Sequence, residues 1–342
     1  MIAIVTGITG QDGAYLAELL LRKGYRVIGT YRSASARDFW RIDELGIRRH
    51  PDLDLVEFDC NGPEASRHLL KTSGATEVYN LAGQSSAMTS LTDPVGTARA
   101  NAMGPLYLLE AIRTASPGAR LFQAGSSELY GNAAQVPQVE STAFSPNSPY
   151  GVAKLFAHWA TVNYREAYGV FGVSGILFNH ESPLRGTEFV TRKISNAFAR
   201  IHLGLQDSMA LGNMNAERDW GYAGDYVLGM WHALQVGQPG TYVFATKRMH
   251  TVRDFVTLAA SAAGFMLDWQ GHAEAEVAID RNSGKTLVRV DPEFYRPLEI
   301  HQRVGDPGKA VRELGWRPST SFETLCSMMV EADIRRNERR LA

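Results

Sequence analysis

Tyr150 and Lys154 stand four residues apart, and Ser126 lies 24 residues before Tyr150. On a helix, a spacing of four places both side chains on one face, about one turn apart. A lysine ammonium beside a phenol favours the phenolate, so such a tyrosine can exchange a proton with an alcohol while a hydride moves to a nicotinamide. The Ser126 hydroxyl, just after a predicted strand, can orient the reacting oxygen. The pattern predicts a centre that interconverts alcohols and ketones.

Glycines recur where the first predicted strand meets the first predicted helix, with the spacing G-x-x-G-x-x-G. Glycine lets a backbone approach a pyrophosphate closely, and a helix N-terminus supplies N–H donors and a positive dipole. We therefore expect this stretch to bind the phosphates of a dinucleotide through six residues: Gly7, Thr9, Gly10, Gln11, Asp12 and Gly13.

The ends of the next predicted strands indicate which dinucleotide is bound. An acidic residue after the second strand would bind the ribose hydroxyl of NAD, whereas this sequence has Arg32, which suits the 2′-phosphate of NADP. Asp59 follows the third strand and is placed to bind the adenine side. Leu81 and Ala82 follow the fourth strand and are expected to flank the cofactor.

The elements that position these residues alternate between strand and helix. Strands are predicted at 2–6, 25–31, 53–58, 76–81, 119–124 and 171–178, and helices at 11–23, 93–114 and 149–168. Short apolar strands that alternate with helices predict an α/β fold, a doubly wound parallel Rossmann sheet covered on both faces.

The second half of the chain is less regular. Helices are predicted at 190–205, 225–235, 251–264, 306–314 and 322–338, a strand at 240–246 and a polar loop at 207–216, while 268–292 is not assigned. We expect residues 1–180 to form an NADP-binding domain with the catalytic residues. Residues 181–342 should form a smaller, mainly substrate-binding domain, with some segments returning to the first.

Composition excludes several classes of protein. The 342 residues carry a formal net charge of −1, which does not indicate a nucleic-acid or membrane-surface partner. The two cysteines, Cys60 and Cys326, are predicted to be reduced and buried. Apolar runs are shorter than the ~18 residues of a membrane span, and the first residues lack a signal pattern. We expect a cytoplasmic protein.

Several long motifs resemble extended short-chain dehydrogenases/reductases that act on nucleotide sugars, and within them the GDP-mannose 4,6-dehydratase family. The resemblance extends from about residue 2 to 335 and lies in eight stretches: 6–16, 77–82, 126–131, 148–150, 175–183, 189–193, 218–221 and 295–297.

The resemblance implies a lyase that converts GDP-mannose to GDP-4-keto-6-deoxymannose and regenerates its NADP. Tyr150 would deprotonate the C4 hydroxyl while hydride passes to the cofactor, Glu128 would remove the C5 proton and protonate the departing C6 hydroxyl, and hydride would return to C6. A reductase or an epimerase needs only the serine, tyrosine and lysine, so Glu128 favours dehydration.

The resemblance also implies the substrate contacts, which we expect to be Ser85, Asn179, Lys193, Arg218, Arg296 and Glu299. It further implies a homodimer or homotetramer. His180 and Glu181 are adjacent, but further ligands do not follow at a useful spacing, so we expect no metal.

Departures from the family pattern leave alternatives open. Ser126 replaces the usual threonine, and the stretches 33–40, 83–88 and 268–290 also differ. The substrate could therefore be another GDP-sugar, such as a GDP-heptose, or another nucleotide sugar. A reductase or epimerase that acts on a 4-keto sugar and a non-catalytic nucleotide sensor are the competing interpretations.

Overall fold

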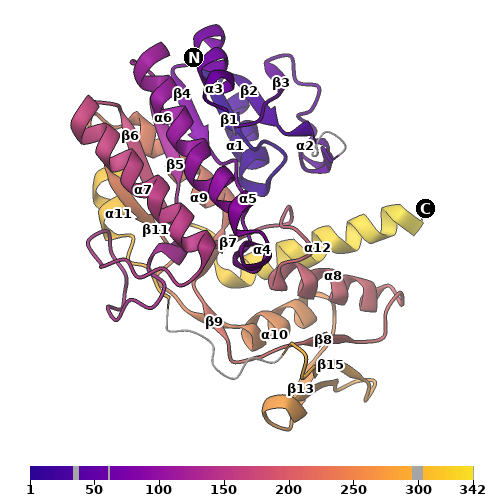
Figure 1. Cartoon of the computed structure of the whole chain (residues 1–342). Helices are drawn as coiled ribbons and strands as arrows, with labels where there is room; N and C mark the ends of the chain where they lie inside the picture. Colours follow the sequence, from indigo (N-terminus) through magenta and orange to yellow (C-terminus); the bar gives the residue numbers. More distant parts are fainter. Residues whose placement is uncertain (34–37, 61, 295–302, 342) are drawn as a thin grey trace. The chain divides into compact units, whose positions relative to one another are not determined.

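The computed structural model describes residues 1–33, 38–60, 62–294 and 303–341 (Figure 1). The chain divides into two compact units, each assembled from three stretches. The first unit contains 1–178, 223–246 and 305–318, and the second contains 179–222, 247–304 and 319–342. Two segments beyond residue 180 therefore belong to the first unit. The roles predicted for the two domains, binding of NADP and binding of the substrate, remain predictions.

The first unit is built on one sheet of seven parallel strands. In spatial order, these strands are β11 (Thr241–Phe244), β6 (Gly172–Leu177), β5 (Arg120–Ala124), β4 (Glu77–Asn80), β1 (Ile2–Thr6), β2 (Arg26–Tyr31) and β3 (Leu53–Glu57). The order reverses beside β1, which is the mark of a doubly wound sheet. The predicted α/β architecture is confirmed.

Helices cover both faces of this sheet, as Figure 1 shows. One layer contains α1 (Gln11–Arg22), α9 (Ala223–Gln235) and α11 (Gly308–Leu314), and the other contains α3 (Pro63–Ser73), α6 (Gly104–Ala115) and α7 (Pro149–Tyr168). Because both faces are covered, the inner strands are buried on both sides, and every residue of β6 is buried.

One predicted helix is interrupted. The stretch expected to be a single helix over 93–114 is α5 (Pro94–Ala98), a π-helical turn (Arg99–Met103) and α6. Pro105 lacks a backbone N–H and so cannot make the ordinary bond to the carbonyl four residues earlier, which explains why the α-helical ladder breaks at this point. Helices that the sequence analysis did not assign are α2 (Trp40–Glu44), α3 and α4 (Ala87–Thr92).

The second unit combines three helices with a small mixed sheet. The helices are α8 (Val190–His202), α10 (Val252–Ala262) and α12 (Phe322–Leu341), and the sheet runs β13 (Leu267–Gln270), β14 (Val277–Asp280), β15 (Thr286–Val290) and β8 (Met209–Leu211). The second unit also contains two short pairs of strands, which are β7 (Asn179–Glu181) with β10 (Trp220–Tyr222), and β9 (Glu217–Arg218) with β12 (His250–Thr251).

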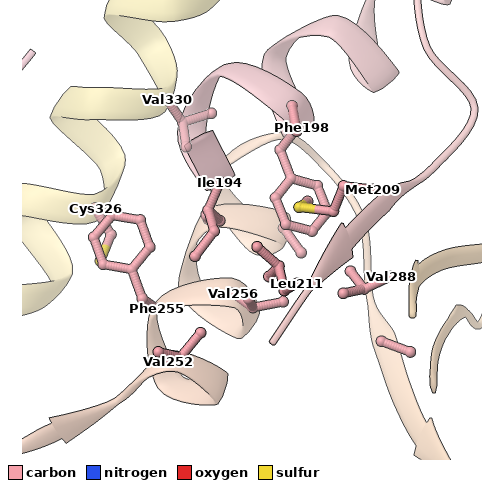
Figure 2. Packing of buried hydrophobic residues seen from close by; sticks show 14 of the residues in the cluster. Ile194, Phe198, Met209, Leu211, Val252, Phe255, Val256, Val288, Cys326 and Val330 are labelled. Carbon is pink, nitrogen blue, oxygen red and sulfur yellow. The ribbon is translucent and has the colours of Figure 1, made fainter. Parts of the chain in front are cut away.

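A hydrophobic core lies among these elements (Figure 2). Phe198 of α8, Leu211 of β8, Phe255 of α10 and Cys326 of α12 are all buried in it. Cys60 of the first unit is buried as well, and both thiols are free, as predicted.

The prediction of a polar loop at 207–216 is partly wrong, because this stretch contains β8. Met209 and Leu211, on either side of the half-buried Ala210, lie in the hydrophobic core, and their strand pairs with β15. A strand of three residues is too short for its alternation to be recognised in a polar sequence. Within the described residues, none of the helices has the length and apolarity needed to cross a membrane.

Candidate active site

The glycine-rich turn lies between β1 and α1, as predicted. Gly7 adopts a left-handed φ of 72°. A Cβ on Gly13 would lie 2.3 Å from the Gly7 carbonyl oxygen, so only glycine fits where α1 packs against the turn. The N-cap of α1 is Gly10, which has no capping side chain. This turn is the close-packed cradle that a pyrophosphate requires.

Leu81 and Ala82 lie against the same turn. A Cβ on Gly7 would be 3.0 Å from the Ala82 Cα. The backbone N–H groups of Leu81 and Ala82 both donate to the Thr6 hydroxyl at 3.0 Å. The segment that follows β4 is therefore fixed to the end of β1, which places these two predicted residues beside the glycines.

Arg32 and Asp59 occupy the carboxyl ends of β2 and β3. These strands are neighbours, and Phe58 donates its backbone N–H to the Tyr31 carbonyl at 2.8 Å. Arg32 is exposed. Burial raises the pKa of the Cys60 thiol, the charge of Asp59 raises it further and the charge of Arg32 lowers it. Both charged side chains are therefore close enough to act on the same thiol. Arg32 and Asp59 therefore lie at the same edge of the sheet as the glycine turn.

Helix α7 carries Tyr150 and Lys154 in its first two turns. The Ser148 hydroxyl accepts a hydrogen bond from the Gly151 N–H at 3.1 Å, and Pro149 occupies the first turn, so the sequence specifies this helix start. Both Tyr150 and Lys154 are buried. The Lys154 Nζ lies 5.9 Å from the centre of the Tyr150 ring.

Lys154 is held in a buried place. Its Nζ donates to the Ala124 carbonyl oxygen at the end of β5, at 2.9 Å. Burial lowers its pKa to about 8, and the charge of Asp12 in the first turn of α1 opposes this shift. Asp12 belongs to the glycine-rich turn, so the charge of that turn acts on Lys154.

Ser126 and Glu128 lie on a 3₁₀ turn over Ser127–Leu129 that directly follows β5. The Ser126 hydroxyl accepts the Glu128 N–H at 3.2 Å and caps this turn. The turn packs on α7, because a Cβ on Gly151 would lie 2.8 Å from the Glu128 carbonyl oxygen. The fold thus brings Ser126, Glu128, Tyr150 and Lys154 together in the first unit.

The sequence analysis missed Asn101. This buried side chain lies in the π-helical turn, accepts the Gln84 N–H at 3.0 Å and donates to the Gln84 carbonyl at 2.8 Å. It therefore fixes the segment after β4, in which Ser85 is exposed. The one local signal was Pro105 inside a predicted helix.

Arg41 is a second residue that sequence reasoning did not single out. It lies in α2 and donates from its guanidinium to the Thr9 carbonyl at 2.9 Å, so it supports the glycine-rich turn from outside. A lone arginine after an irregular loop gives no sequence signal of this contact.

In the second unit, Asn179 and Arg218 belong to small strand pairs that share one segment. Asn179 of β7 is in register with Trp220 of β10, and Arg218 of β9 is in register with His250 of β12. Only one residue separates Arg218 from Trp220, so Arg218 lies two positions along the chain before the residue that pairs with Asn179.

Lys193, on α8, lines a pocket of about 430 Å³ within the second unit. Its Nζ lies 4.6 Å from the centre of the Phe294 ring, and Asn196 and Arg200 line the same pocket. Two cations and an aromatic ring suit an anionic ligand with a flat base. The predicted contacts Arg296 and Glu299 lie outside the described residues.

The Glu181 side chain, next to His180 on β7, is bonded to two neighbouring side chains. The Glu181 carboxylate accepts the Thr191 hydroxyl at 2.5 Å and pairs with Arg185 Nε at 3.2 Å. Among the residues that the structure describes, groups of three or more His, Cys, Asp or Glu side chains able to hold a metal ion do not occur.

Some known proteins are similar to this chain in sequence, and some solved structures are similar to it in fold. The family model described as GDP-mannose 4,6 dehydratase matches residues 4–329. A GDP-mannose 4,6-dehydratase from Sinorhizobium fredii is 47% identical over 97% of this chain and 96% of its own length, and one from Homo sapiens is 44% identical over 97% and 91%. A dTDP-glucose 4,6-dehydratase structure from Streptomyces venezuelae with NAD bound has a TM-score of 0.82 at 22% identity and covers 100% of this chain and 98% of its own, so it shows the fold.

Proposed function

The chain belongs to the GDP-mannose 4,6-dehydratase family and dehydrates GDP-mannose, and on that premise we propose the residues and the cofactor that carry out the reaction. The proposal rests on one observation: Glu128 lies on a turn that packs against the first turn of α7, beside Tyr150. A tyrosine and a lysine are enough for redox chemistry at C4. The carboxyl group is the additional acid–base group that the loss of water requires.

Tyr150 takes the proton of the C4 hydroxyl, and the buried ammonium of Lys154 favours the phenolate that this step needs. Ser126 orients the reacting oxygen through its hydroxyl. Once C4 is a ketone, the C5 proton is acidic, and Glu128 removes it as a carboxylate. The same group, now protonated, gives its proton to the departing C6 hydroxyl. When the hydride returns to C6, C5 takes up a proton from the solvent, and Tyr150 releases the proton that it took from the C4 hydroxyl, so the protons balance.

The residues around the glycine-rich turn fit a dinucleotide. The cradle at Gly13 is closed to any larger residue, and the turn extends to Asp12, whose charge acts on Lys154. We propose NADP because Arg32 follows β2 where NAD-specific chains of this architecture carry an acidic residue. NADP held at this turn would supply the hydride acceptor for C4 and the hydride donor for C6. Solved relatives of this fold bind NAD or NADPH.

We propose that the GDP part of the substrate is bound by residues of the second unit. Lys193 and the pocket that it lines supply two cations and an aromatic ring, which suit a diphosphate and a base. Asn179 and Arg218 are the further contacts of this unit that are carried over from the family motifs. Ser85 lies in a stretch that differs from the family pattern and remains a predicted contact.

The test of this function is mass spectrometry after incubation with GDP-mannose in D₂O and no added reductant. The wild-type product should lose one water and carry deuterium at C5, because the proton that C5 takes up after the elimination comes from the solvent. Glu128→Gln should abolish the loss of water, while the control Glu110→Gln, at an exposed position on α6, should leave it unchanged. Dehydration by Glu128→Gln at the wild-type rate would refute the role of Glu128.

We propose, finally, that two copies of the chain associate through α4, α5 and α7, three helices that contact one another. Val152, Phe156 and Trp159 follow one face of α7 and are 55%, 44% and 54% exposed, and Leu91 of α4 and Val95 of α5 are about as exposed. Apolar side chains exposed together in this way are typical of an interface. Sedimentation of Phe156→Glu should give a monomer where the wild type gives a dimer or a tetramer.

A further inference from the structure

Three polar side chains form a row across the centre of the first-unit sheet. Thr6 of β1, Asn80 of β4 and Gln123 of β5 are in register on adjacent strands. All three are buried, with exposed fractions of 0%, 2% and 1%. Buried polar groups in the middle of an apolar sheet are costly unless each one is hydrogen-bonded, so the row calls for an explanation.

The row is one continuous chain of hydrogen bonds with a single direction. The Thr6 hydroxyl donates to Asn80 Oδ1 at 2.8 Å, Asn80 Nδ2 donates to Gln123 Oε1 at 2.7 Å, and Gln123 Nε2 donates to the Ala124 carbonyl oxygen at 3.0 Å. That same carbonyl accepts the Lys154 ammonium. Each side chain therefore uses one acceptor and one donor.

The opposite end of the chain meets the segment beside the glycine-rich turn. The Thr6 oxygen accepts the backbone N–H groups of Leu81 and Ala82. A single relay of side chains, made of Thr6, Asn80 and Gln123, thus connects the backbone that flanks the cofactor position with the carbonyl that holds the lysine.

We propose that Gln123 is a positioning residue, and that the relay holds Lys154 and the Leu81–Ala82 backbone as one rigid group. Gln123 touches neither substrate nor cofactor in this role, and it acts through the Ala124 carbonyl. The assignment rests on the proposed function, because it is Lys154 that makes the position of this carbonyl matter.

The chemistry of position 123 can be tested because a glutamine has one close analogue. A protonated glutamic acid keeps an acceptor and a donor, whereas an ionised one has lost its donor. A methionine of similar length has neither group. Burial raises the pKa of a carboxyl, so Gln123→Glu should maintain the relay at acid pH and break it as the pH rises.

The experiment compares three variants of the full chain with GDP-mannose as the substrate. For Gln123→Met we expect kcat to fall on the order of 10-fold to 100-fold with KM unchanged, since a misplaced catalytic group costs about that much. Gln123→Glu should approach wild-type kcat at acid pH and lose activity at a lower pH than the wild type does. The control Gln235→Met removes an amide that bonds Glu77 at the other end of β4, and it should leave kcat unchanged.

A second measurement does not depend on turnover. Hydrogen exchange followed by mass spectrometry in the ligand-free chain should show faster exchange at Leu81 and Ala82 in Gln123→Met than in the wild type or in Gln235→Met. If the wild type itself does not dehydrate GDP-mannose, the proposed function fails, and this exchange still decides the relay. A kcat of Gln123→Met within twofold of the wild type, an unshifted pH limb in Gln123→Glu, or unchanged exchange would each overturn the proposal.

Discussion

Replacement of Asp333 tests the electrostatics of the second unit. Asp333 lies on α12 and is fully buried. Its carboxylate accepts hydrogen bonds from Arg192 Nε at 2.9 and 2.8 Å, from the Ser195 hydroxyl at 2.7 Å and from Arg336 at 3.2 Å. Two guanidinium groups therefore share one carboxylate, and Arg192 is the residue directly before Lys193 on α8.

The size of the effect follows from what Asp333→Ala leaves behind. The side chain of Arg192 is 6% exposed and that of Arg336 is 10% exposed, so two cations would stay buried without their shared anion. Loss of one partner from a buried pair costs about 3–5 kcal/mol in the free energy of unfolding. With the usual dependence on urea, the midpoint should fall by on the order of 1–2 M.

Urea unfolding followed by circular dichroism and tryptophan fluorescence measures this change. The matched control is Glu331→Gln on the same helix, whose ion pair with Arg335 spans 3.9 Å between side chains about 60% exposed, and which should lose less than about 1 kcal/mol. A loss for Asp333→Ala as small as the control's would show that water or rearrangement compensates the arginines, and would refute the reasoning.

Three further changes have expected outcomes. Burial lowers the pKa of His158 from 6.5 to about 4, so the folded chain favours the neutral ring. The free energy of unfolding should therefore fall by up to about 3 kcal/mol as the pH drops from about 6.5 to about 4. In urea titrations, His158→Gln should flatten this dependence on pH. Because burial lowers the pKa of Lys154 to about 8, kcat/KM should decline above that pH, and a limb unchanged in Lys154→Arg would assign it to another group. Gly13→Ala places a Cβ 2.3 Å from the Gly7 oxygen, so NADP affinity measured by calorimetry should fall at least about 10-fold, whereas Gly118→Ala, with nothing within 4 Å, should bind normally.

The sequence predicted the parts of the site that depend on local geometry. Tyr150 and Lys154 are four residues apart on a helix that Ser148 and Pro149 begin, so their shared face follows from helix periodicity. Gly7, with its positive φ, marks the turn in the same local way. Patterns of this kind need no knowledge of distant residues.

Contacts between distant residues escaped prediction for the opposite reason. Gln123 and Asn80 are 43 residues apart and meet only because β4 and β5 pair in one particular register. Asp333 and Arg192 are 141 residues apart, and each alone looks like an ordinary helical charge. A single sequence shows neither the register nor the partner.

Each unit is assembled from stretches that are far apart in the sequence, and this determines when each unit can fold during synthesis. The core of the second unit includes Phe322, Leu325 and Met329 of α12, and the first unit includes α11 near residue 310. A ribosome releases the N-terminal residues first, so β1 to β6 can pair while the rest is still being made. The first unit cannot be complete until α11 has emerged, and the second cannot close its core until α12 has emerged. A message truncated before α12 would thus yield a complete first unit joined to a second unit with an exposed apolar core, which is a substrate for chaperones and proteases.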